Sequence, residues 1–146
     1  MSRFTQEELR QRAFERAAWV LRHFWEEQQD KAPGKADVHS RLFDTLVYDI
    51  PVKGKSKNGG GHKEHLVPCA LLRDHAFKMF WDGKSEEDVA EMLRRLLCIA
   101  HITPAEARLL DNELGLKTKM PDGWDFETGS VMARLEAAGI LLELKD

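Results

Sequence analysis

The chain has 146 residues, of which 42% are hydrophobic and 32% charged, and its net charge at pH 7 is −3. That length fits one domain with a buried core, no apolar stretch is long enough to cross a bilayer, and the mild acidity gives no global preference for nucleic acid. The first residues lack the apolar core of a secretory signal. We therefore expect a cytoplasmic protein without a membrane partner, in which Cys69 and Cys98 are free thiols or metal ligands.

The first predicted element is a long amphipathic helix. Thr5 and Glu8 have the spacing of a capping box, and apolar residues then recur at helical spacing to about Gln29. Trp19 and Trp25 lie partly off this apolar stripe. They either widen the buried face or mark a contact with a partner.

The rest of the chain is predicted from periodicity and from turn residues. In chain order we expect a helix over 37–48 (or a strand over 46–52), a loop over 53–61, extended chain over 64–68, helices over 69–80 and 85–97, extended chain over 98–102, a helix over 104–110, irregular chain over 111–128, a helix over 130–138 and a strand over 140–144. Thr103, Pro104 and Glu106 form a strong helix start, with cap, first-turn proline and capping box.

Together these elements predict an α+β fold that is predominantly α-helical and contains a short strand–strand–helix element with a helical insertion. We expect a single domain over residues 1–146. Its parts are an N-terminal helical part (1–52), a central core (62–113) and a C-terminal extension (114–146).

Side chains that can bind metals or carry protons concentrate in two stretches of the central core, 62–69 and 98–106. The first stretch directly follows a run of three glycines. The residues concerned are His62, Glu64, His65, Cys69, Cys98, His101 and Glu106. The pattern predicts a metal site or an acid–base site.

The sequence Glu64-His65-Leu66-Val67-Pro68 resembles the first motif of the HNH (ββα-metal) endonucleases, which has an acidic residue, a histidine, two apolar residues and a proline. Residues 97–106 resemble the second half of the motif in small phage and prophage members. The resemblance covers about a third of the chain. It implies cleavage of DNA phosphodiester bonds, with magnesium or manganese polarising the phosphate and a histidine activating water.

On that resemblance His65 is the general base and Glu64 is a metal ligand. His101 is the second ligand, with Glu106 as its rival. The family's middle asparagine has no counterpart between Cys98 and His101, which leaves open an inactive, degenerate relative.

The same side chains also allow a structural zinc site. Zinc prefers four nitrogen or sulfur donors in a tetrahedron. The available donors are His62, His65, Cys69, Cys98 and His101. A zinc site of this kind indicates a folded binding module in place of an enzyme.

Four lysines surround the glycine run with no carboxylate between Asp49 and Glu64. They are Lys53, Lys55, Lys57 and Lys63. We expect them either to contact the phosphates of a nucleic acid or to keep a loop solvated.

A third hypothesis needs no metal. A small, helix-rich chain with four tryptophans suits a non-catalytic binding or inhibitor protein of phage type, with an anti-defence role against a host nuclease or a CRISPR complex. The acidic and aromatic residues at 122–127 either seek a basic surface on such a partner or cover the core. DNA is the expected partner of a nuclease, and a protein or nucleoprotein complex is the expected partner of an inhibitor.

Overall fold

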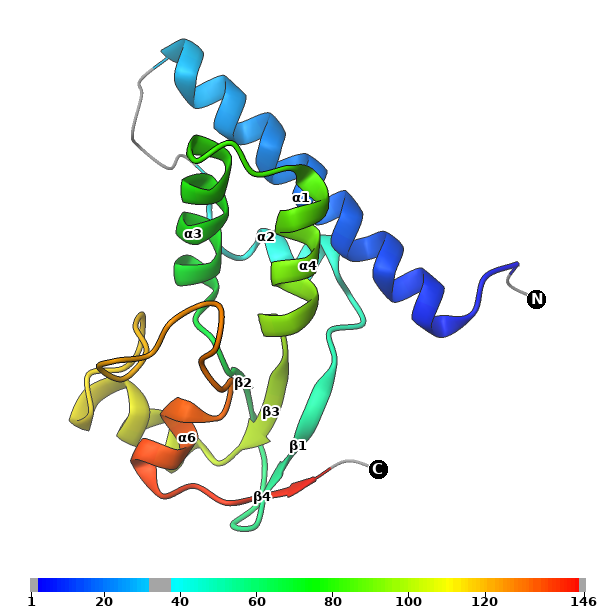
Figure 1. The fold of residues 1–146 in the computed structure, drawn as a ribbon. Helices are drawn as coiled ribbons and strands as arrows, with labels where there is room; N and C mark the ends of the chain where they lie inside the picture. Colours follow the sequence, from blue (N-terminus) through cyan, green and yellow to red (C-terminus); the bar gives the residue numbers. More distant parts are fainter. Residues whose placement is uncertain (1–2, 32–37, 145–146) are drawn as a thin grey trace. The chain divides into compact units, whose positions relative to one another are not determined.

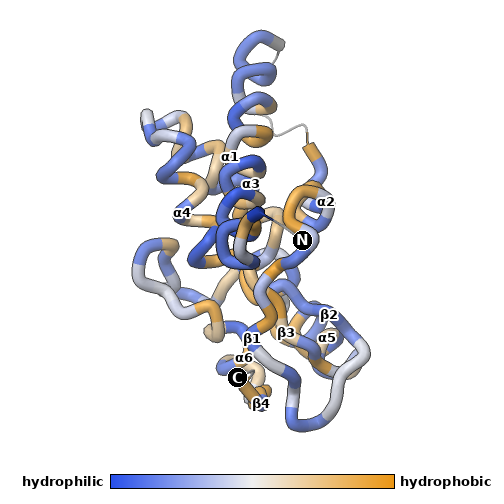
Figure 2. Tube along the Cα trace, turned by 90° about the vertical axis from the view of Figure 1, so that its right-hand side faces the viewer, coloured by the Kyte–Doolittle hydropathy of each residue, from blue (hydrophilic) through white to orange (hydrophobic). Residues whose placement is uncertain are grey.

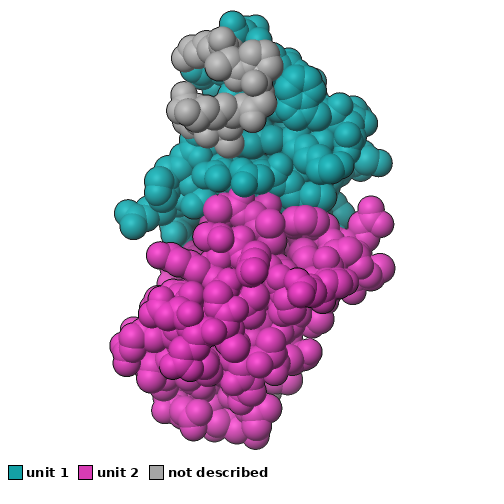
Figure 3. Space-filling model, turned by 90° about the vertical axis from the view of Figure 1, so that its left-hand side faces the viewer, with its two compact units in different colours: residues 1–50, 72–95 teal, residues 51–71, 96–146 magenta. Residues whose placement is uncertain are grey.

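A computed structural model describes residues 3–31 and 38–144 of the chain (Figure 1). Helices make up 52% and strands 13%, so the fold is α+β and mostly helical, as predicted. The chain divides into two compact units, coloured separately in Figure 3. Unit 1 contains residues 1–50 and 72–95, and unit 2 contains residues 51–71 and 96–146.

Unit 1 is helical. Its elements are α1 (Gln6–Lys31), α2 (Leu42–Leu46), α3 (Cys69–Trp81, which begins in unit 2) and α4 (Glu86–Leu96, which ends in unit 2). The capping box at the start of α1 is confirmed, because the Thr5 hydroxyl accepts from the Glu8 amide at 3.1 Å and the Glu8 carboxylate accepts from the Thr5 amide at 3.3 Å. In the described part of the chain, no helix is both long enough and apolar enough to span a membrane.

The interior of unit 1 is apolar and aromatic. Phe14, Leu21 and Phe43 are buried, and the Trp25 ring lies 5.6 Å from that of Phe80. Trp25 thus widens the buried face of α1, whereas Trp19 on the same helix is 61% exposed.

The helix predicted over 37–48 is much shorter in the structure. Only Leu42–Leu46 is helical, residues 38–41 form a bend and a turn, and residue 37 lies outside the described residues. No side chain caps the helix at Arg41, and a helix of five residues gains too few internal hydrogen bonds to extend itself. The alternative strand over 46–52 is also wrong, because β1 begins only at Val52.

Unit 2 contains a four-stranded sheet. Its strands are β1 (Val52–Ser56), β2 (His62–His65), β3 (Ile99–Ile102) and β4 (Leu142–Leu144), in the spatial order β2-β3-β1-β4. β3 pairs antiparallel with β2 and parallel with β1, and β4 pairs antiparallel with β1. The colouring of Figure 2 shows the hydrophobic character of β3 against the hydrophilic turn that joins β1 to β2.

The prediction of a loop over 53–61 is wrong for its first half, which is strand β1. Its composition is that of a loop, but its exposure alternates as a strand requires: Lys53 and Lys55 are exposed, and Gly54 and Ser56 are buried. A Cβ at Gly54 would collide with the carbonyl oxygen of Glu143 on β4. The glycine is therefore there to let two backbones approach, a role that glycine often has inside strands.

One face of the sheet is covered by α5 (Pro104–Arg108), the π-helical turn η1 (Leu109–Glu113) and α6 (Ala133–Ala138). The core between them is formed by Leu66, Cys98, Ala100, Ile102, Ala107, Leu110, Leu135 and Ile140. The predicted last helix is confirmed but shorter, and Gly139 ends it in the left-handed region at φ +70°, where glycine avoids the strain that a Cβ would cause.

Candidate functional site: the two faces of the sheet

The register of the sheet separates Glu64 from His65. Glu64 lies opposite Ala100, and His65 lies opposite Ile99. Directly opposed residues project from the same face, and successive residues project from opposite faces. Glu64 therefore lies on the face that α5, η1 and α6 cover, which we call the helix-covered face, and His65 lies on the other.

On the helix-covered face Glu64 is 8% exposed, and both oxygens of its carboxylate have partners. Its Oε1 accepts a hydrogen bond from Arg134 Nη2 at 3.0 Å. Its Oε2 lies 2.8 Å from His62 Nε2. The motif's acidic residue is thus held in a buried ion pair.

Arg134, on α6, is 1% exposed, and each nitrogen of its guanidinium has a partner. Its Nε donates to the Leu116 carbonyl at 2.8 Å, and its Nη1 donates to the His65 carbonyl at 2.9 Å. A second carboxylate, Asp111, lies 3.9 Å from Nη2. A buried arginine keeps its charge because its donors are met in this way, and here it joins β2, η1 and α6.

Glu106 is the second buried carboxylate of unit 2, and it is also engaged. Its Oε1 accepts from the Thr103 amide at 2.9 Å, which completes the predicted capping box. Its Oε2 accepts from Ser56 Oγ at 2.8 Å and from Asn58 Nδ2 at 3.3 Å. Burial alone would raise the pKa of Glu106, but the hydrogen bonds from Thr103, Ser56 and Asn58 outweigh it and lower the pKa.

The two cysteines do not form a disulfide. The Cys98 thiol faces the Leu96 carbonyl at 3.7 Å, and burial raises its pKa to about 11. Cys98 lies in the apolar core of unit 2. Cys69 is partly buried at the start of α3.

The donors expected for a metal do not converge. Glu64 and Glu106 are occupied on the helix-covered face, and His101 projects from the opposite face. Within residues 3–31 and 38–144 no three histidine, cysteine, aspartate or glutamate side chains are grouped so that they could hold a metal ion. In the described residues, the structure gathers neither the magnesium or manganese set nor the zinc set of His62, His65, Cys69, Cys98 and His101 at one place.

The opposite face carries the basic side chains. His101 lies opposite Lys63 on β2 and opposite Lys55 on β1, so the three form a row across three strands. Lys55 and Lys63 are exposed and His101 is partly exposed. Lys53, earlier on β1, and Lys57, in the turn that follows β1, are exposed too. We call these five residues the basic face.

Little negative charge offsets the basic face. Residues 51–71 contain four lysines and one carboxylate, Glu64, and that carboxylate is paired with Arg134 on the other side of the sheet. Glu143, opposite Lys55 on β4, is the acidic side chain that borders the basic face at this edge. The lysines that were predicted to contact nucleic acid are therefore brought together on one surface.

His65 and His101 share this face. His65 lies opposite Ile99, and His101 is two residues further along β3, so their Cα atoms are about 7–8 Å apart. Ile99, the residue opposite His65, is 4% exposed. His65 therefore lies at the buried end of the face, and His101 lies among the exposed lysines.

Sequence reasoning missed the partners of the two carboxylates. Arg134, Ser56 and Asn58 lie 70, 50 and 48 residues from the acids that they bind. No local sequence pattern predicts that Arg134 is buried, since an arginine in a helix is usually exposed. The alternation of lysines with small residues at 53–56 was a usable signal for β1.

Comparison of the chain with protein-family models, with curated proteins and with solved structures finds no match.

Proposed function

We propose that unit 2 binds the phosphate backbone of a nucleic acid through its basic face, without cleaving it. The observation that carries this proposal is the row Lys63, His101 and Lys55, set in register across three strands, with Glu143 as the carboxylate that follows Lys55 at the β4 edge. Lysines that neutralise phosphates release condensed counterions, and this release drives sequence-independent binding.

The spacing of the lysines on β1 suits a phosphate backbone. Alternate residues of a strand are roughly 6.6 Å apart, and successive phosphates of one DNA strand are about 3.4 Å apart along the helix axis. Lys53 and Lys55 on β1 are thus separated by about two phosphate steps measured along the helix axis. Direct reading of bases needs side chains that reach into a groove, so we propose binding without sequence preference.

The net charge of −3 limits the strength of this binding. Long-range attraction follows the charge of the whole protein, whereas short-range contact follows the local surface. We expect binding at low ionic strength that weakens steeply as salt is added.

The test is a fluorescence-anisotropy titration of a labelled DNA duplex and of its single strands, performed with the wild type and with Lys55→Gln/Lys63→Gln. The matched control is Lys117→Gln/Lys119→Gln, which removes two exposed lysines of the same unit outside the sheet. The proposal expects the first double variant to lose most of the affinity and the control to keep it. Equal losses in the two variants would refute it.

HNH-like cleavage of DNA remains the second candidate. The observation in its favour is the order β2, β3 and α5, an antiparallel strand pair followed by a helix, with His65 and His101 on one face. Because the acidic donors lie on the other face, we derive no catalytic step from this arrangement.

Cleavage is tested by incubating supercoiled plasmid with the protein and added magnesium or manganese. Nicking that disappears in His65→Ala but persists in His62→Ala, a histidine of the same strand on the helix-covered face, would establish the nuclease. Binding without nicking would leave the non-catalytic module as the function.

A further inference from the structure

We propose that the centre of the basic face is a binding site for one terminal phosphate, the phosphate monoester at the end of a nucleic-acid strand. The site consists of Lys63, His101 and Lys55, and we call it the phosphate seat. This inference rests on the proposed function, because it names the part of the nucleic acid that the middle of the basic face holds. Lys53 and Lys57 lie outside the row and remain available to the rest of the strand.

The pairing of the sheet places the three side chains of the seat next to one another. His101 on β3 lies opposite Lys63 on β2 and opposite Lys55 on β1. Neighbouring strands are about 4.8 Å apart, so the backbones of the two lysines are about 10 Å apart with His101 between them. A lysine carries its charge on a flexible four-carbon stem, so both ammonium groups can reach an anion that rests on the shorter His101 side chain.

The glycine turn before β2 lies against two members of the seat. A Cβ placed on Gly60 would be 3.3 Å from Lys55 Cε and 3.7 Å from His101 Cβ. The far end of the Lys55 stem and the base of the His101 side chain therefore lie beside the same point of the backbone. A larger residue at position 60 would press on Lys55, whereas glycine leaves the row open to a ligand.

The donors of the phosphate seat are not used by carboxylates of the protein. In the part of the chain that the structure describes, no carboxylate forms an ion pair with Lys55, Lys63 or His101, and the His101 ring has no hydrogen-bond partner. Glu143 lies opposite Lys55 on β4, on the side of β1 that is away from His101. It borders the seat without entering it, so a phosphate meets donors that are free to bind it.

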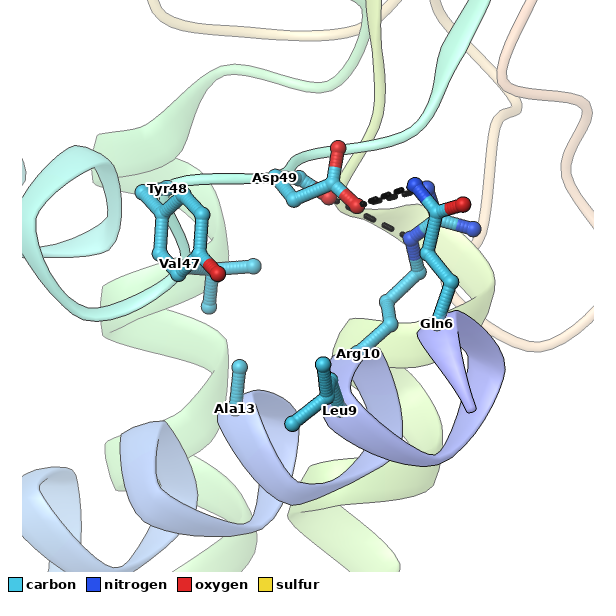
Figure 4. A pocket seen from close by; sticks show the side chains of 7 residues that line it. All are labelled: Gln6, Leu9, Arg10, Ala13, Val47, Tyr48 and Asp49. Atoms are coloured by element: carbon cyan, nitrogen blue, oxygen red, sulfur yellow. Dashed lines mark hydrogen bonds and ion pairs between the residues drawn. The ribbon is translucent and has the colours of Figure 1, made fainter. Parts of the chain in front are cut away.

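Arg10 in unit 1 shows the opposite situation. It lines a hollow of about 390 Å³ between α1 and residues 47–49 (Figure 4). Its Nη2 donates to Asp49 Oδ2 at 3.1 Å and its Nε donates to the Asp49 carbonyl at 3.2 Å, while Gln6 Nε2 donates to the same Oδ2 at 3.1 Å. Because Asp49 neutralises this arginine, the hollow is a poor site for a phosphate.

The three donors of the seat suit a terminal phosphate better than a phosphate within the backbone. A phosphate monoester carries a charge of roughly −1.5 to −2 at pH 7 and has three strong acceptor oxygens. A backbone phosphate carries a single charge and has fewer free oxygens, because a second ester bond uses one of them. Lys63, His101 and Lys55 can each donate to one oxygen of a monoester, and the two lysines balance its charge. We therefore expect the seat to distinguish the end of a strand from its interior.

The experiment compares short DNA duplexes of one sequence that end in a 5′-phosphate, in a 3′-phosphate or in hydroxyl groups, by competition anisotropy with the full chain at pH 7 and low salt. A further duplex is one base pair longer, which adds backbone charge without a terminal phosphate. We expect the wild type to bind at least one phosphorylated duplex about tenfold more tightly than the hydroxyl duplex, the effect of one added hydrogen bond between charged groups. The longer duplex should gain no more than about twofold.

His101→Gln and Lys63→Gln should each abolish the preference for the phosphorylated end. Lys63 is exposed, so Lys63→Gln decides the matter if His101→Gln fails to fold. The matched control is Lys53→Gln, which removes an exposed lysine of the basic face outside the row and should weaken the binding of all duplexes alike while the preference persists.

Equal binding of phosphorylated and hydroxyl duplexes by the wild type would overturn the phosphate seat and leave the proposed function standing. No binding of any duplex would overturn both. A preference that survives in Lys63→Gln, that disappears in Lys53→Gln, or that one added base pair reproduces would also overturn the seat.

Discussion

On the helix-covered face of the sheet a charged side chain is buried and paired, whereas on the basic face the charged side chains are exposed. Glu64 is 8% exposed and is held by Arg134, while Lys63 and His65 on either side of it project from the other face. A strand places consecutive residues on opposite faces whatever their chemistry. The difference teaches that a short acid–histidine motif becomes a site only where its surroundings bring both side chains to one place.

The largest loss of stability is expected from Arg134→Ala, which removes the arginine that binds Glu64 on the helix-covered face. Removing Arg134 leaves the buried Glu64 with His62 alone as its partner, and breaking a buried ion pair in this way costs about 3–5 kcal/mol of the free energy of unfolding. Urea unfolding measures it. Arg108→Ala, at an exposed arginine of α5, is the control and should cost at most about 0.5 kcal/mol. A loss below about 1 kcal/mol for Arg134→Ala would show that the ion pair does not hold this face.

The Cys98 thiol reports on the closure of the same face. Because burial raises its pKa to about 11 from 9.0, its thiolate at pH 8 is roughly a hundredfold scarcer than that of an exposed cysteine. In Cys69→Ser, where Cys98 is the remaining thiol, iodoacetamide should react at least that much more slowly with the native protein than with the urea-unfolded protein. Comparable rates would mean that the face is open to solvent.

Glu106→Gln should cost about 2 kcal/mol at pH 7, because hydrogen bonds to a charged acceptor are among the stronger ones. The folded-state pKa of Glu106 lies below its ordinary value of 4.5, so its contribution is complete above pH 4.5 and is lost as the pH falls through the lowered pKa. Thermal unfolding from pH 7 down to pH 3 checks this. A constant difference between variant and wild type at all pH values would contradict the lowered pKa.

The smallest effect on stability is expected on the basic face. Lys55→Gln/Lys63→Gln should change the free energy of unfolding by no more than about 0.5 kcal/mol, since exposed lysines contribute little to the folded state. The same variant should reduce the slope of log affinity against log salt by about 2 units, roughly 0.9 for each lost phosphate contact. A large loss of stability with an unchanged slope would show that these lysines stabilise the fold and do not contact phosphates.

Much of the fold could be predicted from the sequence because its signals are local. The capping boxes at Thr5 and Thr103, the strand at 99–102 and the left-handed glycine at 139 all follow from residues within a few positions of each other. Strand β1 was missed because its lysines and glycines have low strand propensity. What makes it a strand is pairing with β3 and β4, which lie more than 40 residues away.

The candidate site could be predicted only as a set of residues. The four lysines were identified, and the structure places them together, but which face each histidine and carboxylate occupies depends on the register between β2 and β3. A shift of one residue in that register would exchange the faces of Glu64 and His65. The partner that engages Glu64 is Arg134, 70 residues away.

The most direct test of the account uses two histidines of the same sheet. His62 lies on the helix-covered face beside Glu64, and His101 lies on the basic face between Lys55 and Lys63. Imidazole NMR signals are followed as a short DNA duplex is added. We expect the His101 signals to shift in step with binding and the His62 signals to stay in place. Shifts at His62 with none at His101 would contradict it.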